Sequence, residues 1–75
     1  MTLSVVIPVL NEENNVPELA RRLRETLDDA GIPFEVVFVN DGSTDRTPQI
    51  LQELHDQDKR IKAVHLARNF GHQGA

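Results

Sequence analysis

Acidic and amide side chains directly follow two short apolar runs in this sequence. Asn11 and Glu12 come after the first run, and Asn40, Asp41 and Ser43 come after the second. A carboxylate accepts hydrogen bonds from a ribose diol or from the N–H of a base, and neighbouring amide and hydroxyl groups donate and accept further bonds. If the two apolar runs are adjacent strands, this combination predicts a nucleotide site.

Other interpretations of these polar residues are open. The segment 41–45, DGSTD, has the composition of an ordinary turn and helix cap, and by itself it is more often structural than functional. Asp45 is expected to brace the loop, and Glu13 and Asn14 are expected to be exposed where a helix begins. Neither G-x-G-x-x-G nor G-x-x-x-x-G-K-[ST] is present, which excludes a dinucleotide fingerprint and a P-loop. The three histidines lack metal-ligand spacing, and only His72 is expected in a loop near a substrate.

The apolar spacing predicts three strands and two helices. The near-continuous run rich in β-branched residues at 3–9 is typical of a strand buried on both faces of a parallel sheet. A second buried strand is predicted at 34–39, and a third, weaker strand at 61–66. Apolar residues at helical spacing predict helices that begin near residues 16 and 47, and a third helix is expected to open within 71–75. The first helix is expected to begin with a capping box of Asn15 and Glu18 and with Pro17 in its first turn, and to end at Gly31 and Pro33. Thr47 is expected to cap the second helix, with Pro48 at its first position.

The order β-α-β-α-β predicts an α/β fold with three parallel strands in the order 3-2-1. Crossover connections of this kind are almost always right-handed, so the chain is one half of a doubly wound, Rossmann-like sheet. Ligands bind beyond the carboxyl ends of such strands. Glu12 and Asp41 would project there into one crevice, toward which both helices direct unpaired N–H groups. The first strand would be central in a complete sheet, so we expect residues 1–75 to be part of a larger domain.

Composition narrows the class of protein. The 75 residues contain no cysteine, which excludes disulfides and thiolate metal sites, and no apolar stretch is long enough to span a bilayer. Twelve acidic residues against eight basic ones give a net charge of −4, which argues against a general nucleic-acid binder. Residues 59–75 carry four basic residues and no acid. These bases could face phosphate or an anionic membrane, although a solvated strand edge is the more ordinary explanation for all but Arg68.

Three motifs stand in order along the chain: SVVIPVLNEEN at 4–14, VNDGSTD at 39–45 and RNFG at 68–71. Together they resemble the amino-terminal third of family 2 glycosyltransferases of the GT-A fold. The likeness is greatest to the branch of dolichol-phosphate mannosyltransferases and bacterial polyprenyl-phosphate glycosyltransferases. It covers essentially the whole sequence and implies that residues 1–75 are the N-terminal, incomplete part of a single GT-A domain.

The resemblance implies nucleotide-sugar-binding roles for particular positions. Those that fall where such enzymes contact the donor nucleoside are Pro8, Leu10, Glu12, Val39 and Asp41. Arg68 falls near the donor diphosphate, and Asn11 and Asn40 line the same crevice. Many members of the family have Tyr in place of Leu10 and Asp in place of Asn40. No catalytic residue is expected within this chain.

The resemblance also implies what the complete enzyme would need. Its donor would be an NDP-sugar linked to UDP or GDP, its acceptor polyprenyl phosphate or a glycan, and its cofactor Mg²⁺ or Mn²⁺. The Asp-x-Asp metal motif, the catalytic residues and the membrane-associated segments would lie beyond Ala75, so the chain alone is expected to be inactive. The site would be cytoplasmic or on the cytoplasmic face of the membrane.

Two other classes of protein are alternatives to this one. A non-catalytic nucleotide-binding or assembly module is the alternative to an enzyme, and in that case the free edge of the first strand would be an assembly surface. A receiver-type phosphate binder is disfavoured, because Ala67 and Arg68 follow the third strand where an acceptor Asp would be required.

Overall fold

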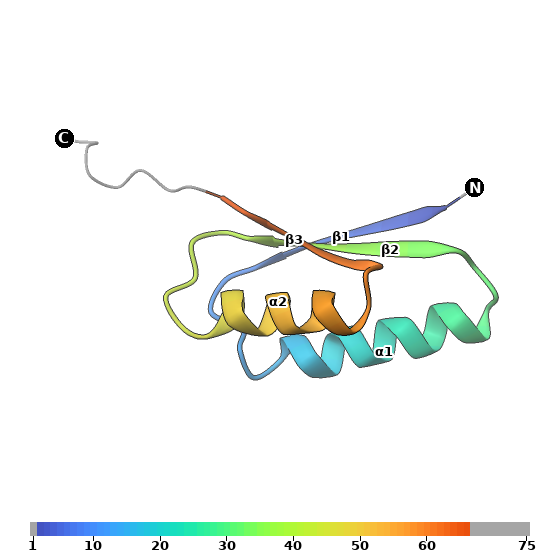
Figure 1. Ribbon diagram of the computed structural model, residues 1–75, viewed down its shortest axis with the longest axis horizontal. Helices are drawn as coiled ribbons and strands as arrows, with labels where there is room; N and C mark the ends of the chain where they lie inside the picture. The colour runs from blue at the N-terminus through green and yellow to red at the C-terminus, as the bar shows by residue number, and fades with distance from the viewer. Residues whose placement is uncertain (1, 67–75) are drawn as a thin grey trace.

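The described chain alternates strands and helices. The computed structural model describes residues 2–66, and Figure 1 shows their arrangement. The elements are β1 (Leu3–Val9), α1 (Val16–Asp29), β2 (Phe34–Asn40), α2 (Thr47–Gln57) and β3 (Ile61–His65). Each of the three strands and both complete helices is confirmed, with β2 one residue longer and β3 one residue shorter than expected. The expected start of a third helix lies outside the described residues.

The three strands form a parallel sheet in the order β1-β2-β3, which confirms the α/β, half-Rossmann topology. Val5 pairs with Val36, and Val36 pairs with Ile61, so the strands are in register near the middle of the sheet. β2 is central, and β1 and β3 are the edges of the described sheet. All three carboxyl ends therefore point toward the same end of the molecule.

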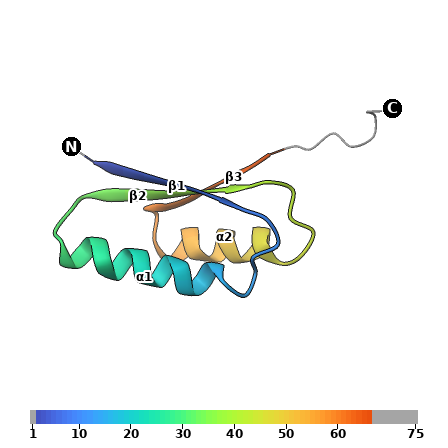
Figure 2. The ribbon, with the colours of Figure 1, turned by 180° about the vertical axis from the view of Figure 1, so that it is seen from behind.

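Both helices cover the same face of the sheet. Figures 1 and 2 show α1 and α2 on one side of the strands from opposite viewpoints. The two right-handed crossovers advance in the same direction, from β1 to β2 to β3, so each places its helix on that side. The expected burial of the first strand on both faces is therefore wrong for the described residues. On the outer face, Val6 is 63% exposed and Val64 is 46% exposed.

The core lies between the helices and the inner face of the sheet. Phe34, Val36 and Phe38 of β2 are buried while the residues between them are half-buried, which is the two-residue alternation of a strand. Leu51 of α2 and Val16 of α1 complete this core from the helix side. Burial of one such apolar side chain contributes about 1.5–3 kcal/mol. β2 is thus the strand with the most residues in this core.

The first helix begins where expected but without the expected bonds. Asn15 is its N-cap and Pro17 lies in its first turn, yet no side-chain hydrogen bond caps the helix. Glu18 instead bonds to Arg21 and Arg22 on the same helix, and these bonds hold the pKa of Glu18 below its usual value. The predicted capping box is therefore wrong, because charged guanidinium donors bind a carboxylate more strongly than a backbone N–H does.

Gly31 ends α1, as its position predicted. Its φ of +70° lies in the left-handed region that favours glycine. The N–H of Gly31 donates to the C=O of Asp28, and the N–H of Ile32 donates to the C=O of Leu27. The last carbonyls of the helix are thereby satisfied, and the chain turns back into β2.

Phe38→Ala is expected to destabilise the fold by about 3–5 kcal/mol, because it would leave a cavity in the central strand. The measurement is the free energy of unfolding from a urea titration. Val6→Thr on the outer face is the matched control, and its expected change is within about 0.5 kcal/mol. Equal losses in the two variants would contradict the placement of the core on the helix-covered face.

Candidate functional site

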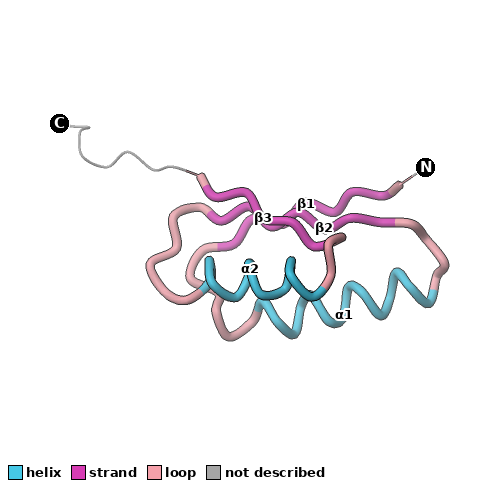
Figure 3. Tube along the Cα trace, in the orientation of Figure 1, coloured by secondary structure: helices cyan, strands magenta, loops and turns pink. Residues whose placement is uncertain are grey.

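The loops that leave β1 and β2 lie at the same end of the sheet. Residues 10–15 connect β1 to α1, and residues 41–46 connect β2 to α2; Figure 3 shows both loops in pink. Ligands bind at this end in open parallel sheets. Val9 pairs with Asn40, and the N–H of Asp41 donates to the C=O of Val9 at 3.0 Å. The two loops therefore start from adjacent backbone positions.

Hydrogen bonds between these two loops form what is here called the loop clamp. Its residues are Asn11 and Glu13 of the first loop and Ser43, Thr44, Asp45 and Arg46 of the second. The N–H of Asn11 donates to Ser43 Oγ at 2.9 Å, and the N–H of Thr44 donates to Asn11 Oδ1 at 2.8 Å. The N–H of Glu13 donates to Asp45 Oδ2 at 3.2 Å, and the N–H of Arg46 donates to Glu13 Oε1 at 3.0 Å. Each loop supplies donors and acceptors, so displacement of one breaks bonds to the other.

The amino end of α2 is occupied by groups of the chain itself. The N-cap is Arg46, and the N–H of Thr47 donates to Asp45 Oδ1 at 2.9 Å. The predicted role of Thr47 as the cap is wrong, because its buried hydroxyl accepts the N–H of Glu12 at 3.0 Å. The expectation that this helix directs unpaired N–H groups at a ligand is also wrong for Arg46 and Thr47. Carboxylates of Glu13 and Asp45 already accept those two N–H groups.

Asp45 braces the loop, as predicted for it. Partial burial raises its pKa, but hydrogen bonds from Thr47 and from the N–H of Glu13 more than offset this effect, so the pKa of Asp45 is lowered. The fold therefore favours the ionised carboxylate. The expected exposure of Glu13 is wrong, because this residue is half-buried within the loop clamp, whereas Asn14 is exposed as expected.

Asn40 lies buried beneath the second loop, with 4% of its surface exposed. Its Oδ1 accepts the N–H of Ser43 at 3.0 Å, and its Nδ2 lies 3.0 Å from Nδ1 of His65 at the end of β3. Because Nδ2 can only donate, His65 accepts through Nδ1 and carries its ring proton on Nε2. Asn40 thus ties the second loop to β3, and its contact with a ligand stays a prediction.

Glu12 and Pro8 line a cavity of about 210 Å³ beside the free edge of β1. The remaining lining residues come from β1 and the start of α1, and they are Ile7, Val9, Asn15, Val16 and Leu19. Glu12 Oε1 accepts the side-chain N–H of Asn15 at 2.7 Å, which orients the carboxylate. An apolar lining with one oriented carboxylate suits an uncharged ring that carries a hydrogen-bond donor.

The other predicted residues lie outside that cavity. Pro8 and Val39 are partners in the sheet register, so Val39 shares the outer face with Pro8. Leu10, which is 50% exposed, and the half-buried Asp41 lie in the two loops. Asp41 thus does not line the cavity that Glu12 lines, and the single crevice expected to hold both carboxylates stays a prediction.

Two of the predicted positions, Arg68 and His72, lie outside the described residues, so their roles stay predictions. Within residues 2–66, no group of three histidine or acidic side chains could hold a metal ion. Mg²⁺ or Mn²⁺ as the cofactor of the complete enzyme therefore stays a prediction. In the same range, no helix combines the length and the apolar character needed to cross a bilayer.

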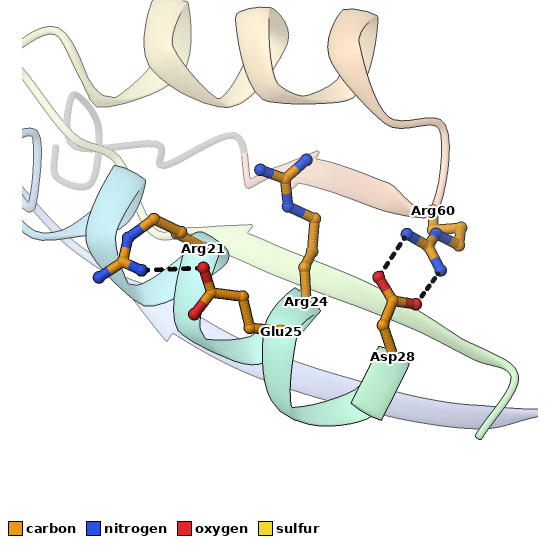
Figure 4. Close-up of a pocket in the computed structure, with 5 residues that line it drawn as sticks. All are labelled: Arg21, Arg24, Glu25, Asp28 and Arg60. Atoms are coloured by element: carbon orange, nitrogen blue, oxygen red, sulfur yellow. Dashed lines mark hydrogen bonds and ion pairs between the residues drawn. The ribbon is translucent and has the colours of Figure 1, made fainter. Parts of the chain in front are cut away.

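A charged cavity at the opposite end of the sheet is built from ion pairs. Figure 4 shows its lining side chains, which are Arg21, Arg24, Glu25, Asp28 and Arg60. Hydrogen bonds to Asp58 and then to Asp28 raise the pKa of Arg60. Lys62 similarly pairs with Glu35 at 2.8 Å. These two basic residues are therefore engaged within the chain, which supports a structural role for them and not a phosphate site.

Sequence reasoning missed the loop clamp. Its bonds join residues 32 or 33 positions apart, and no local pattern indicates which Ser, Thr, Asn or Asp meets which backbone group. The sequence held one indication of the clamp. Asn11 directly follows a strand, and asparagine tolerates the left-handed region of backbone conformation, in which the φ of +52° at Asn11 lies.

The chain is similar to known proteins along nearly its whole length. Residues 4–75 match the family model described as glycosyl transferase family 2. The uncharacterized glycosyltransferase YkcC of Bacillus subtilis is 47% identical over 70 residues, which are 93% of this chain and 22% of that protein. The undecaprenyl-phosphate 4-deoxy-4-formamido-L-arabinose transferase of Pseudomonas aeruginosa strain LESB58 is 46% identical over 74 residues, 97% of this chain. The chain spans 22% of the length of both relatives.

Asp45→Asn is expected to lower the melting temperature at neutral pH. The substitution replaces one carboxylate oxygen by an NH₂ group, which cannot accept a hydrogen bond, so either the bond from the N–H of Glu13 or the bond from the N–H of Thr47 is lost. Since the pKa of Asp45 is lowered in the folded chain, its stabilising effect is complete above its ordinary pKa of 3.8 and is lost as the pH falls through the folded pKa. The difference in melting temperature between wild type and Asp45→Asn should therefore be constant near neutral pH and shrink in acid.

Thermal melts followed by circular dichroism from neutral to acidic pH measure this difference. Glu53→Gln, which removes an exposed carboxylate of α2, is the control and should show no such trend. A difference for Asp45→Asn that persists undiminished at the most acidic pH would contradict the bracing role of the ionised carboxylate.

Proposed function

Since this chain belongs to glycosyl transferase family 2, we propose that it is the donor-nucleotide-binding part of an enzyme that transfers a sugar from an NDP-sugar to an acceptor. The observation that carries the proposal is the loop clamp, which holds the segments containing Glu12 and Asp41 together at the carboxyl ends of β1 and β2. Open parallel sheets bind nucleotides at that end.

The charge of the two loops favours the nucleoside end of the donor. Residues 10–15 and 41–46 contain four carboxylates and one basic residue. Carboxylates accept hydrogen bonds from ribose hydroxyls or a base N–H, whereas they repel a diphosphate. Glu12 and Asp41 are the carboxylates that the family resemblance assigns to the nucleoside, whereas Glu13 and Asp45 serve the loop clamp. Arg68 is the base assigned to the diphosphate.

The acceptor is proposed from the relatives. One relative is named as an undecaprenyl-phosphate sugar transferase, so polyprenyl phosphate is the proposed acceptor, with a glycan as the other candidate. In a direct displacement, an acceptor oxygen bonds to the anomeric carbon of the sugar as the bond from that carbon to the nucleoside diphosphate breaks. The enzyme would act in the cytoplasm or on the cytoplasmic face of the membrane.

The divalent cation belongs to the full-length enzyme in this proposal. Residues 2–66 hold no group of three candidate metal ligands, and the resemblance implies that the ligands of either ion lie in an Asp-x-Asp motif beyond Ala75. The acceptor-binding and catalytic residues would lie there too. The chain by itself is therefore expected to bind a nucleotide without transferring a sugar.

A non-catalytic nucleotide-binding or assembly module is the second candidate. The open edge of β1 and the exposed Val6 and Val64 on the outer face favour it, because strand edges and apolar faces of this kind pair with other protein surfaces. Sugar transfer by the full-length protein supports the enzyme, and nucleotide binding without transfer supports the module.

Asp41→Ala in the full-length protein is expected to weaken nucleotide binding about 10-fold to 100-fold, since a hydrogen bond to a charged group contributes about 1.5–3 kcal/mol. A thermal-shift panel of UDP-, GDP- and dTDP-sugars with Mn²⁺ first identifies the donor. Titration calorimetry with the matching nucleoside diphosphate then measures the dissociation constant. Glu53→Gln is the matched control for loss of a carboxylate elsewhere.

An unchanged dissociation constant in Asp41→Ala would show that the pocket is assigned wrongly. If no nucleotide sugar stabilises the full-length protein, the enzyme proposal loses its donor and the assembly module is favoured. Sugar transfer by the 75-residue chain alone would contradict the division of roles between this chain and the rest of the enzyme.

A further inference from the structure

Asn11 lies where the chain leaves β1 and turns toward α1. Its φ is +52°, and among the described residues it is the only non-glycine residue with a positive φ. Asparagine tolerates this region better than most side chains, but a residue held there requires support from its surroundings. The second loop provides that support.

Two adjacent groups of Asn11 hold two successive residues of the second loop. Its Oδ1 accepts the N–H of Thr44 at 2.8 Å, and its own N–H donates to Ser43 Oγ at 2.9 Å. Glu12 directly follows Asn11, and Asp41 precedes Ser43 by two residues. The bonds made by Asn11 therefore act between the two segments that carry the carboxylates assigned to the nucleoside.

We propose that Asn11 is a positioning residue, which fixes the spacing of Glu12 and Asp41 through Ser43 and Thr44 and does not itself contact the donor. This role rests on the proposed nucleotide function of the two carboxylates. Loops that are held together before binding lose less conformational freedom when a ligand arrives, so the ligand binds more tightly. Without the bonds from Asn11, the same groups would bind the same nucleotide more weakly.

Two bonds that hold the first loop do not involve the Asn11 side chain. The N–H of Glu12 bonds to the buried hydroxyl of Thr47, and the N–H of Glu13 bonds to Asp45. We therefore expect the fold to survive removal of the Asn11 side chain. An effect of Asn11 on nucleotide affinity can therefore be separated from an effect on folding, because a melting temperature close to that of wild type is expected.

The test compares two substitutions in the full-length protein. Asn11→Gly deletes Oδ1 but keeps a residue for which a positive φ is unstrained, and we expect the dissociation constant for the matching nucleoside diphosphate to rise about fivefold to tenfold. Asn11→Asp keeps the acceptor for the N–H of Thr44. Its affinity should match wild type at a salt concentration that screens the added charge.

Steady-state kinetics supply a second readout. Loosening of the donor loops should raise the KM for the NDP-sugar in Asn11→Gly while the KM for the acceptor stays unchanged. A general loss of structure would change both values and lower the melting temperature.

A double substitution separates positioning from direct contact. Ser43→Ala removes the neighbouring bond between the same two loops. If Asn11 acts through the second loop, Asn11→Gly and Ser43→Ala together weaken binding by less than the product of their separate effects, since either change loosens the same pair. A direct contact between Asn11 and the nucleotide would make the effects independent.

Each contrary result has a distinct meaning. Unchanged affinity in Asn11→Gly, with weakened binding in Asp41→Ala, would overturn the positioning role while leaving the nucleotide site intact. Independent effects in the double variant, or equal weakening in Asn11→Asp and Asn11→Gly, would place the Asn11 amide on the ligand and overturn the positioning role. No effect of Asp41→Ala would overturn the nucleotide site and the positioning role with it.

Discussion

The site depends on how the backbone N–H groups that leave β1 find partners. Groups beyond the end of a strand have no neighbour in the sheet ladder, and a buried N–H without a partner is unfavourable. Three successive N–H groups instead donate to side chains of the second loop and of the start of α2: Asn11 to Ser43, Glu12 to Thr47, and Glu13 to Asp45. These bonds fix the first loop against the second and also fix where α2 begins.

The carboxylates of the two loops have a structural role as well as a proposed functional one. Glu13 and Asp45 accept the N–H groups of the N-cap Arg46 and of Thr47, and negative charge is favourable at the amino end of a helix. A phosphate would have to displace these carboxylates to reach the same N–H groups. This geometry is therefore compatible with membership of glycosyl transferase family 2 if the two loops bind the nucleoside and residues elsewhere bind the diphosphate.

The elements and their order could be predicted, because they follow from local patterns and from the handedness of crossovers. The bonds at the loops could not. Thr47 can cap its own helix or bond to Glu12, and Glu18 can bond to a backbone N–H or to Arg21; only the folded geometry selects between these partners. Burial of both sheet faces was over-predicted, because a β-branched run indicates a strand but does not reveal which face its neighbours cover.

The sequence separation of the loop clamp couples the clamp to the pairing of β1 with β2. Its bonds join residues 32 or 33 positions apart, and closing a loop of that length is entropically unfavourable. The pairing of β1 with β2 joins residues 31 positions apart and so closes the same segment of chain. The clamp therefore adds its bonds at little further entropic cost, and a change that weakens the β1–β2 pairing would loosen the two loops as well.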